Sequence, residues 1–180
     1  MRSDRYFAAL LLGELREKSA VPALVAATRD KSINYVAATS LGEIGDASAI
    51  PALRELAEAF PEERVFAGYG LAALGAPDGF DLLQDVALSD LQWVQRRHAV
   101  ELLGKTADRR AVPILLRGLK DEHPNVRVSS VRSLAEIGDP AAIPALRAAL
   151  GDSEVTPVNA PTTVAVEAEK AIAAIESRRR

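Results

Sequence analysis

The sequence contains no cysteine and only two histidines among its 180 residues. Without cysteine, the chain forms neither disulfide bonds nor thiolate metal sites. His98 and His123 lie far apart in the sequence, which argues against a histidine-based metal site. We therefore expect no metal and no cofactor.

The sequence also lacks a long apolar run. No stretch approaches the ~20 apolar residues that a membrane-spanning helix needs. The run Tyr6–Leu12, preceded by Arg2 and Arg5, faintly resembles a signal peptide, but it is short, Asp4 interrupts the basic region, and no small-residue cleavage site follows. We expect a cytoplasmic protein that does not bind membranes.

Aromatic residues make up only 4% of the chain, and the formal net charge is −3, which argues against a general nucleic-acid binder. The two halves differ, since residues 1–90 carry a net charge of −6 and residues 91–180 a net charge of +3. Nucleic-acid binding through the basic C-terminal half therefore stays open as an alternative.

Residues 121–150, DEHPNVRVSSVRSLAEIGDPAAIPALRAAL, show the pattern of a helix, a short turn and a second helix. Pro124 suits the first turn of a helix, where its missing N–H costs nothing. Gly138-Asp139 indicates the turn, because glycine tolerates the left-handed conformation and aspartate can cap the next helix. The second helix is expected to bury a stripe that ends at Leu150.

Two residue types recur in register with this unit, 17 residues apart, and successive copies are spaced by 29, 30, 32 and 31 residues. One is an arginine near the start of the first helix, and the other is a proline in the second helix. The arginine positions are Arg5, Asn34 (a substitution), Arg64, Arg96 and Arg127, and the proline positions are Pro22, Pro51, Asp81 (a substitution), Pro113 and Pro144. The chain therefore holds five copies.

The phrases LGEIGDASAIPAL (41–53) and VRSLAEIGDPAAIPAL (131–146) resemble the short HEAT-like repeat of phycobilisome lyases and many other bacterial and archaeal proteins. The resemblance covers residues 4–150 and implies an all-α, right-handed solenoid. We expect a single domain over residues 1–180, with a loop and a capping helix after five two-helix repeats. The expected boundaries are 4–30, 31–59, 60–88, 89–120, 121–150, the loop 151–161 and the capping helix 162–177. In the first copy we expect helices at 4–16 and 20–28. On the capping helix we expect Glu167 at an outer, polar position, and Arg178, Arg179 and Arg180 as a solvated tail.

The third copy is the least regular. Gly68 and Gly70 fall inside its first helix, where each costs ~1 kcal/mol relative to alanine. We expect them to permit close helix contact rather than to mark a ligand site. The turn Gly75–Gly79 lacks an aspartate directly after the first glycine.

Arginine and aspartate recurring in register favour ion pairs between neighbouring hairpins, because half-buried charges need partners. The resemblance implies the same structural role. The candidate acids are the turn residues Asp46, Asp108 and Asp139, and the alternative is an anion-binding stripe of arginines.

In HEAT-like solenoids the second helices line the concave face. Helical periodicity then predicts which side chains face the groove, with an acidic middle and a basic C-terminal end. We expect a partner to bind there mainly by charge complementarity. The predicted groove residues are Arg29, Arg54, Glu55, Glu58, Asp81, Gln84, Asp85, Leu116, Arg117, Lys120 and Arg147.

Two further surfaces carry aromatic residues. Tyr6 and Phe7 belong to the first helix, which has no preceding helix in the sequence to cover it, so this edge is a second candidate for binding a partner or another copy. Trp93 is a candidate interface residue, although a tryptophan wedged between neighbouring repeats is the commoner arrangement.

No motif of an enzyme is present: the sequence lacks H-E-x-x-H, a glycine-rich phosphate loop and a supported Ser–His–acid grouping. HEAT-like deoxyhypusine hydroxylases use His-Glu pairs for a di-iron site, whereas here Ala99 follows His98 and Pro124 follows His123. We expect a non-catalytic adaptor that binds another protein. An accessory subunit of a phycobilin lyase-type system is the main alternative.

Overall fold

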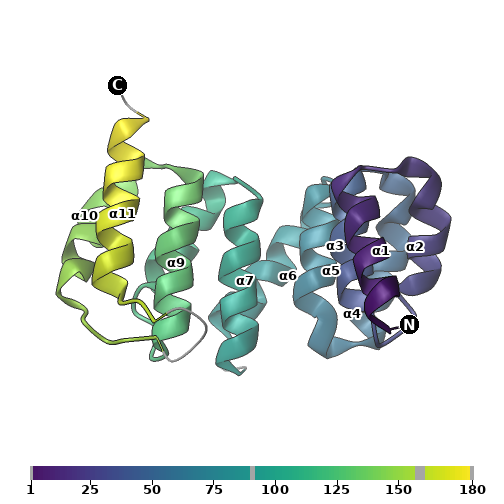
Figure 1. Ribbon diagram of the computed structural model, residues 1–180, viewed down its shortest axis with the longest axis horizontal. Coiled ribbons are helices and arrows are strands. Elements are labelled where there is room, and N and C mark those ends of the chain that lie inside the picture. The colour runs from purple at the N-terminus through teal and green to yellow at the C-terminus, as the bar shows by residue number, and fades with distance from the viewer. Residues whose placement is uncertain (1, 90–91, 157–160, 179–180) are drawn as a thin grey trace. The chain divides into compact units, whose positions relative to one another are not determined.

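The computed structural model describes residues 2–89, 92–156 and 161–178, and it is built from helices throughout (Figure 1). Within these residues the one β pairing found is an isolated bridge between Val155 and Thr163. The α-helices are α1 (Arg2–Glu14), α2 (Val21–Ala27), α3 (Asn34–Ile44), α4 (Ile50–Ala59), α5 (Arg64–Ala73), α6 (Pro77–Leu88), α7 (Trp93–Lys105), α8 (Val112–Gly118), α9 (Pro124–Ile137), α10 (Ile143–Ala148) and α11 (Val164–Ser177).

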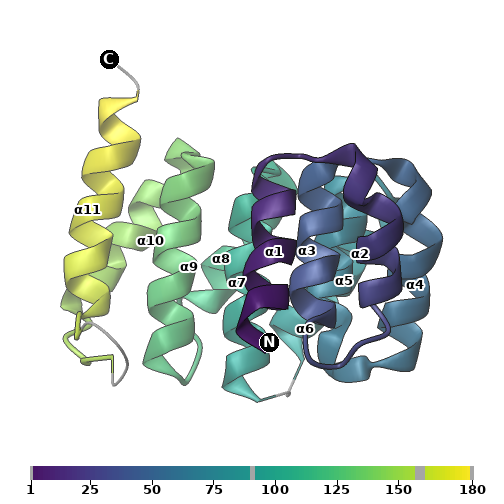
Figure 2. The same ribbon diagram turned by 45° about the vertical axis from the view of Figure 1, so that its right-hand side comes forward.

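The helices form two compact units, residues 1–85 and 86–180. We call α1, α3, α5, α7, α9 and α11 the first helices, and α2, α4, α6, α8 and α10 the second helices. In each unit the first helices form one layer and the second helices another. Figure 2 shows α7, α9 and α11 side by side, with α10 behind them.

Within each unit, neighbouring first helices pack against one another: α1 on α3 and α3 on α5 in unit 1, and α7 on α9 and α9 on α11 in unit 2. The second helices α2, α4, α8 and α10 also pack against the first helix that follows them. Burial between neighbouring repeats, rather than around one central core, is the packing of a solenoid. The predicted all-α repeat fold is confirmed.

The turns between first and second helices follow the predicted chemistry. Gly45 and Gly138 end α3 and α9 in the left-handed conformation, with φ of 79° and 72°. Asp46 and Asp139 then accept hydrogen bonds from backbone N–H groups and cap the short 3-10 helices that lead into α4 and α10. A glycine followed by a capping aspartate therefore turns the chain within few residues.

The core of both units is built on one leucine per repeat. Leu41, Leu71, Leu103 and Leu134 occupy the same repeat position, seven residues after the arginine position, and each is 0% exposed. Full burial of a leucine side chain stabilises the fold by ~1.5–3 kcal/mol. The leucine at this repeat position therefore marks the face of each of these first helices that points into the core.

Small residues allow the first helices to approach one another closely. The Ser40 hydroxyl donates to the carbonyl of Ala9 at 2.9 Å, and the Ser133 hydroxyl donates to the carbonyl of Val100 at 2.8 Å. A Cβ atom on Gly70 would lie 2.7 Å from the carbonyl oxygen of Ala38. The predicted role of Gly70 in close helix contact is confirmed.

Several predicted helix ends were wrong. α10 ends at Ala148 and a 3-10 turn over Ala149–Gly151 follows, so Leu150, expected in the core, is 40% exposed. The expected turn at Gly75–Gly79 is shorter, because Pro77 already begins α6. The predicted helices 4–16 and 20–28 are observed as α1 and α2, with Arg16 in the turn.

The C-terminal helix α11 covers α9 as expected, but two of its side chains are placed differently. Glu167, expected at an outer position, is 8% exposed and accepts hydrogen bonds from Arg132 and Lys170. Arg178, expected in a solvated tail, donates to the carbonyls of Ala135 and Glu136 at the end of α9. Both side chains therefore help to hold α11 on the unit; Arg179 and Arg180 lie outside the described residues.

Candidate interaction surfaces

The predicted groove residues lie on the second helices or, for Arg29 and Lys120, two residues after a second helix ends. Most of them are solvent-exposed, and Gln84 and Leu116 are half-buried. The exposed ones are Arg29, Arg54, Glu55, Glu58, Asp81, Asp85, Arg117, Lys120 and Arg147. Their side chains are thus available on one layer of each unit, but they differ in what they contact.

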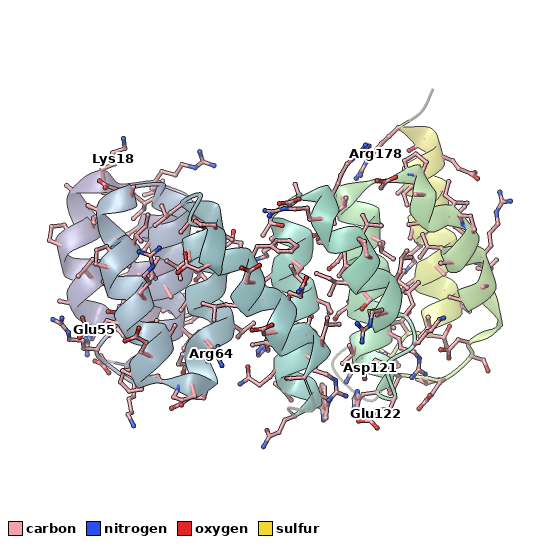
Figure 3. All side chains as sticks on the ribbon, turned by 180° about the vertical axis from the view of Figure 1, so that it is seen from behind. Lys18, Glu55, Arg64, Asp121, Glu122 and Arg178 are labelled. Carbon is pink, nitrogen blue, oxygen red and sulfur yellow. The ribbon has the colours of Figure 1, made fainter. Side chains whose placement is uncertain are left out.

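In unit 1, ion pairs link successive second helices. Arg29 Nη2 lies 2.9 Å from Glu55 Oε2, and Arg54 Nε lies 2.8 Å from Asp78 Oδ2. Figure 3 labels Glu55 on the side of the second helices. The hydrogen bond from Arg29 keeps the pKa of Glu55 below its ordinary value. Arg29, Arg54 and Glu55, which were predicted to bind a partner, are therefore bound to other residues of the chain.

A groove of about 420 Å³ also lies on unit 1, between α4, α5 and α6. Arg54, Glu58 and Arg64 line it, and the half-buried Leu82 contributes apolar surface. The lining contains two positive charges, Arg54 and Arg64. The charge of Arg54 is neutralised by Asp78.

A second groove of about 420 Å³ lies on unit 2, between α8 and α10. Its surface is mostly apolar and is lined by Leu116, Leu119, Lys120, Ala145, Ala148, Ala149 and Asp152. The carboxylate of Asp152 is paired with Arg127 at 2.7 Å. Among the described residues, Lys120 has no carboxylate partner, so its positive charge is uncompensated at this groove.

The repeated arginines are structural in unit 2. Arg96 binds Asp121 at 2.8 Å and Glu122 at 3.1 Å, and its side chain is only 10% exposed. Burial disfavours a charged carboxyl group at Asp121, but the hydrogen bonds from Arg96 and from the backbone N–H of His123 lower its pKa below the ordinary value. Figure 3 shows Asp121 and Glu122 together on this unit.

Arg127 repeats the arrangement one repeat later. Its side chain, also 10% exposed, binds Asp152 and Glu154 and donates to the carbonyls of Asp121 and Glu122. Arg5 binds Asp30 at 2.8 Å in unit 1. Arginines therefore do pair across neighbouring hairpins, and an anion-binding stripe of arginines is ruled out at Arg96 and Arg127.

The predicted acidic partners were wrong. The acids lie 25 residues after each arginine, at Asp30, Asp121 and Asp152, just before the next first helix or at the loop that precedes α11. The turn acids cap 3-10 helices, as Asp108 does by accepting a hydrogen bond from the backbone N–H of Arg110. Asp139 also pairs with Arg109 of the preceding hairpin at 3.6 Å, so one turn acid does join neighbouring hairpins, but not through the repeated arginines. In the sequence, the aspartates that precede a first helix cannot be told apart from those that follow one. Only the packing of neighbouring repeats shows which of them lies next to a repeated arginine.

The outer face of α1 carries an exposed apolar stripe. Phe7, Leu11 and Leu15 are 62%, 53% and 68% exposed, and they follow one another at four-residue spacing. Tyr6 is half-buried and its ring contacts those of Phe7 and Tyr35. The predicted edge therefore consists of Phe7 and the two leucines rather than of Tyr6.

Trp93 begins α7 and stacks on His123, which caps α9, with ring centroids 3.9 Å apart and planes at 4°. This is the arrangement of a tryptophan between neighbouring repeats. His98 lies half-buried on α7, where burial and the charge of Arg97 lower its pKa. Across the described part of the chain, no three His, Cys, Asp or Glu side chains gather as they would around a metal ion.

None of the described helices is both long and apolar enough to cross a membrane. The residues that the sequence analysis missed are Leu119, Ala145 and Ala149 of the α8–α10 groove. α10 ends at Ala148 and a 3-10 helix over Ala149–Gly151 follows, whereas α4 of unit 1 continues to Ala59.

Two layers of helices, repeated in register and stacked on their neighbours, define an α-solenoid of HEAT-like hairpins. The family model for HEAT repeats matches residues 2–68 and 80–167. The chain therefore belongs to the HEAT repeat family. No curated protein matches the sequence.

Three solved structures resemble the chain. A chain of the complex of CpcE and CpcF of phycocyanin lyase from Nostoc sp. PCC7120 is 20% identical over 95% of this chain and 73% of that chain, with a TM-score of 0.59. Human deoxyhypusine hydroxylase in complex with glycerol is 20% identical over 98% and 81%, with a TM-score of 0.54. An engineered protein is 19% identical over 98% and 92%, with a TM-score of 0.57. At these identities the likeness concerns the fold.

Proposed function

We propose that the protein is a non-catalytic scaffold that binds a partner protein through its second helices. The observation that carries this proposal is the pair of grooves on that layer, each beside exposed charges. Within the described residues, the side chains of Glu58, Asp81, Arg117 and Lys120 are without a hydrogen-bonding or ion-pair partner. Exposed charges beside a groove favour electrostatic recognition of a second protein.

The face of α1 is the alternative surface. Its exposed stripe would suit an apolar contact, either with another protein or with a second copy of the chain. It carries fewer polar groups to fix an orientation, so we place the main site on the second helices.

An accessory role in attaching a bilin cofactor is the second candidate function. The phycocyanin lyase proteins named above occur as a complex of two proteins. A chain of this fold could act in the same way, as one protein of an assembly. No residue of this chain is assigned to bilin chemistry.

The experiment is an affinity capture from the source organism's lysate with mass spectrometry, using the wild type and Arg117→Glu/Arg147→Glu as paired baits. Both side chains are exposed on unit 2. Arg147 also binds Glu176 of α11 at 3.2 Å, so circular dichroism of the double variant is needed to establish that the helices are retained. We expect a protein retained by the wild type and lost by the double variant. Leu11→Glu/Leu15→Glu is the matched bait for the α1 face.

Loss of the captured protein with the α1 variant, and not with the arginine variant, would move the binding site to α1. Enrichment of bilin, detected by visible absorbance, would favour the second candidate. Enrichment of nucleic acid would overturn both.

A further inference from the structure

The groove between α8 and α10 arises from a difference between the two units at equivalent repeat positions. In unit 1, Arg29 follows α2 and Glu55 lies on α4, and the two side chains form an ion pair. Counting from the first residue of each second helix, the equivalent positions in unit 2 hold Lys120 and Ala148. The cation is therefore kept, while the carboxylate that neutralises it is absent.

The residues between the two helices are mostly apolar. Arg54 of α4 corresponds to Arg147 of α10, which binds Glu176 of α11 at 3.2 Å and is not among the residues that line the groove. Leu116 and Leu119 are half-buried, and the alanines of α10 that face them leave the space between the two helices open. Unit 2 thus has an apolar hollow where unit 1 has a bridging pair of charges.

The early end of α10 enlarges this hollow. Leu56 of α4 is 2% exposed and fills the core of unit 1, whereas Ala149 stands at its position in unit 2. A volume of about 420 Å³ is within the range of ~300–1,000 Å³ typical of ligand pockets. It can therefore receive apolar side chains of a bound segment.

We propose that this groove binds a segment of a partner protein that carries a carboxylate next to large apolar side chains. The carboxylate would pair with Lys120 in the place that Glu55 takes in unit 1, and the apolar side chains would cover Leu116 and Leu119. The inference rests on the proposed function and specifies the chemistry of its partner.

Nucleic acid fits this groove less well. Binding of a phosphate backbone depends on several cations in a row, whereas Lys120 is the one uncompensated charge among the residues that line the groove. Bases also stack on aromatic side chains, and the described lining contains aliphatic ones. An acidic and apolar peptide segment matches both features.

Three fluorescein-labelled synthetic peptides test the chemistry by fluorescence anisotropy: one of glutamate and leucine, one of glutamate and alanine, and one of lysine and leucine. We expect the full-length protein to bind the first about tenfold or more tightly than the others, which corresponds to ~1.4 kcal/mol. Equal binding of all three, no binding of the first, or tighter binding of a single-stranded RNA would overturn the inference.

Ala148→Glu tests whether the peptide binds in the groove between α8 and α10. The new carboxylate should pair with Lys120 as Glu55 pairs with Arg29. The variant should therefore bind the glutamate–leucine peptide about tenfold more weakly, without a lower thermal midpoint. Ala26→Glu is the matched control, because Ala26 is exposed at the same repeat position of α2. If both variants bind the peptide like the wild type, the groove is not the site.

Lys120→Glu should weaken binding of the same peptide. Lys105→Glu, which changes an exposed lysine of α7, should leave the binding unchanged. Circular dichroism of each variant establishes that the helices are retained. A captured lysate protein that is lost with Arg117→Glu/Arg147→Glu but kept by Ala148→Glu would overturn this inference and leave the proposed function standing.

Discussion

The two units carry their charges on different layers. In unit 1 the ion pairs between repeats are exposed, and two of them, Arg29–Glu55 and Arg54–Asp78, cross the second helices. In unit 2 the arginines of the first helices, Arg96 and Arg127, are almost buried in ion-pair networks. Between α8 and α10 the layer of second helices carries an open groove instead.

This difference shows that one repeat can be stabilised in two ways. In unit 2 the arginines of the first helices bind acids in the loops that precede the next first helix, and no ion pair between α8 and α10 is found among the described residues, although Arg147 of α10 binds Glu176 of α11. The side chains between α8 and α10 can therefore serve binding. The opposite arrangement in unit 1 uses the same exposed face for contacts within the chain. We therefore place the strongest binding surface on unit 2.

The largest expected effect is a loss of folding stability that should be similar in the two units. Leu134→Ala and Leu41→Ala truncate fully buried leucines at the same repeat position. Each should lower the free energy of unfolding by ~2–5 kcal/mol, because a cavity adds to the lost transfer free energy. Chemical denaturation measures the change. An unaltered denaturation midpoint in either variant would show that the repeat register is wrong.

The next effect should separate the units. Arg127→Met removes a nearly buried cation bound to two carboxylates and two carbonyls, and should cost about 3 kcal/mol, the lower end for breaking a buried pair. Arg5→Met, at a 58% exposed side chain, should leave the denaturation curve nearly unchanged. Similar losses in both variants would contradict the contrast between the units.

Low pH should weaken the attachment of α11 by protonating Glu167. Hydrogen bonds from Arg132, and then from Lys170 and Thr162, lower its pKa from 4.5 to about 2. Since the folded-state pKa is depressed, its stabilisation is present above pH ~4.5 and is lost as the pH falls towards 2. Glu167→Gln should therefore have a lower thermal midpoint than the wild type at pH 7, and the gap should narrow near pH 2.

Glu169→Gln, at an exposed position of the same helix, is the matched control. A gap between Glu167→Gln and the wild type that stays constant from pH 7 to pH 2 would exclude this role of the carboxylate.

The smallest effect concerns a turn that occurs once in each unit. Arg16 and Ala107 adopt left-handed conformations, with φ of 51° and 53°, where other turns have glycine. Ala107→Gly should raise the free energy of unfolding by ~1 kcal/mol by relieving this conformation, and Arg16→Gly should act similarly. Thermal melts measure both, and a decrease would mean that the flexibility of glycine in the unfolded chain outweighs the relief.

Much of the fold could be predicted from the sequence because its signals are local. The turn Gly138-Asp139, the proline in the second helices and the spacing of Leu41 and Leu134 each act within one repeat. The placements that failed depend on contacts between repeats. Glu167 looks like a surface residue on a helical wheel, and only Arg132 of α9, 35 residues away, explains its burial.

For the candidate site, the exposure of single side chains could be predicted from the sequence, but their ion pairs with other repeats could not. Helical periodicity correctly gave Arg117, Lys120 and Arg147 as exposed side chains of the second helices. It did not show that Glu55 would be bound by Arg29, or that the equivalent Ala148 would leave Lys120 uncompensated. Such a difference is visible only when the repeats are aligned by the helix ends that the structure supplies.

The most direct test of the account is amide hydrogen exchange of the full-length protein with and without the protein captured from lysate. Binding through the second helices of unit 2 predicts slower exchange in α8 and α10, and unchanged exchange in α1. Protection confined to α1, with α8 and α10 unaffected, would contradict the account and place the partner on the stripe of Phe7, Leu11 and Leu15.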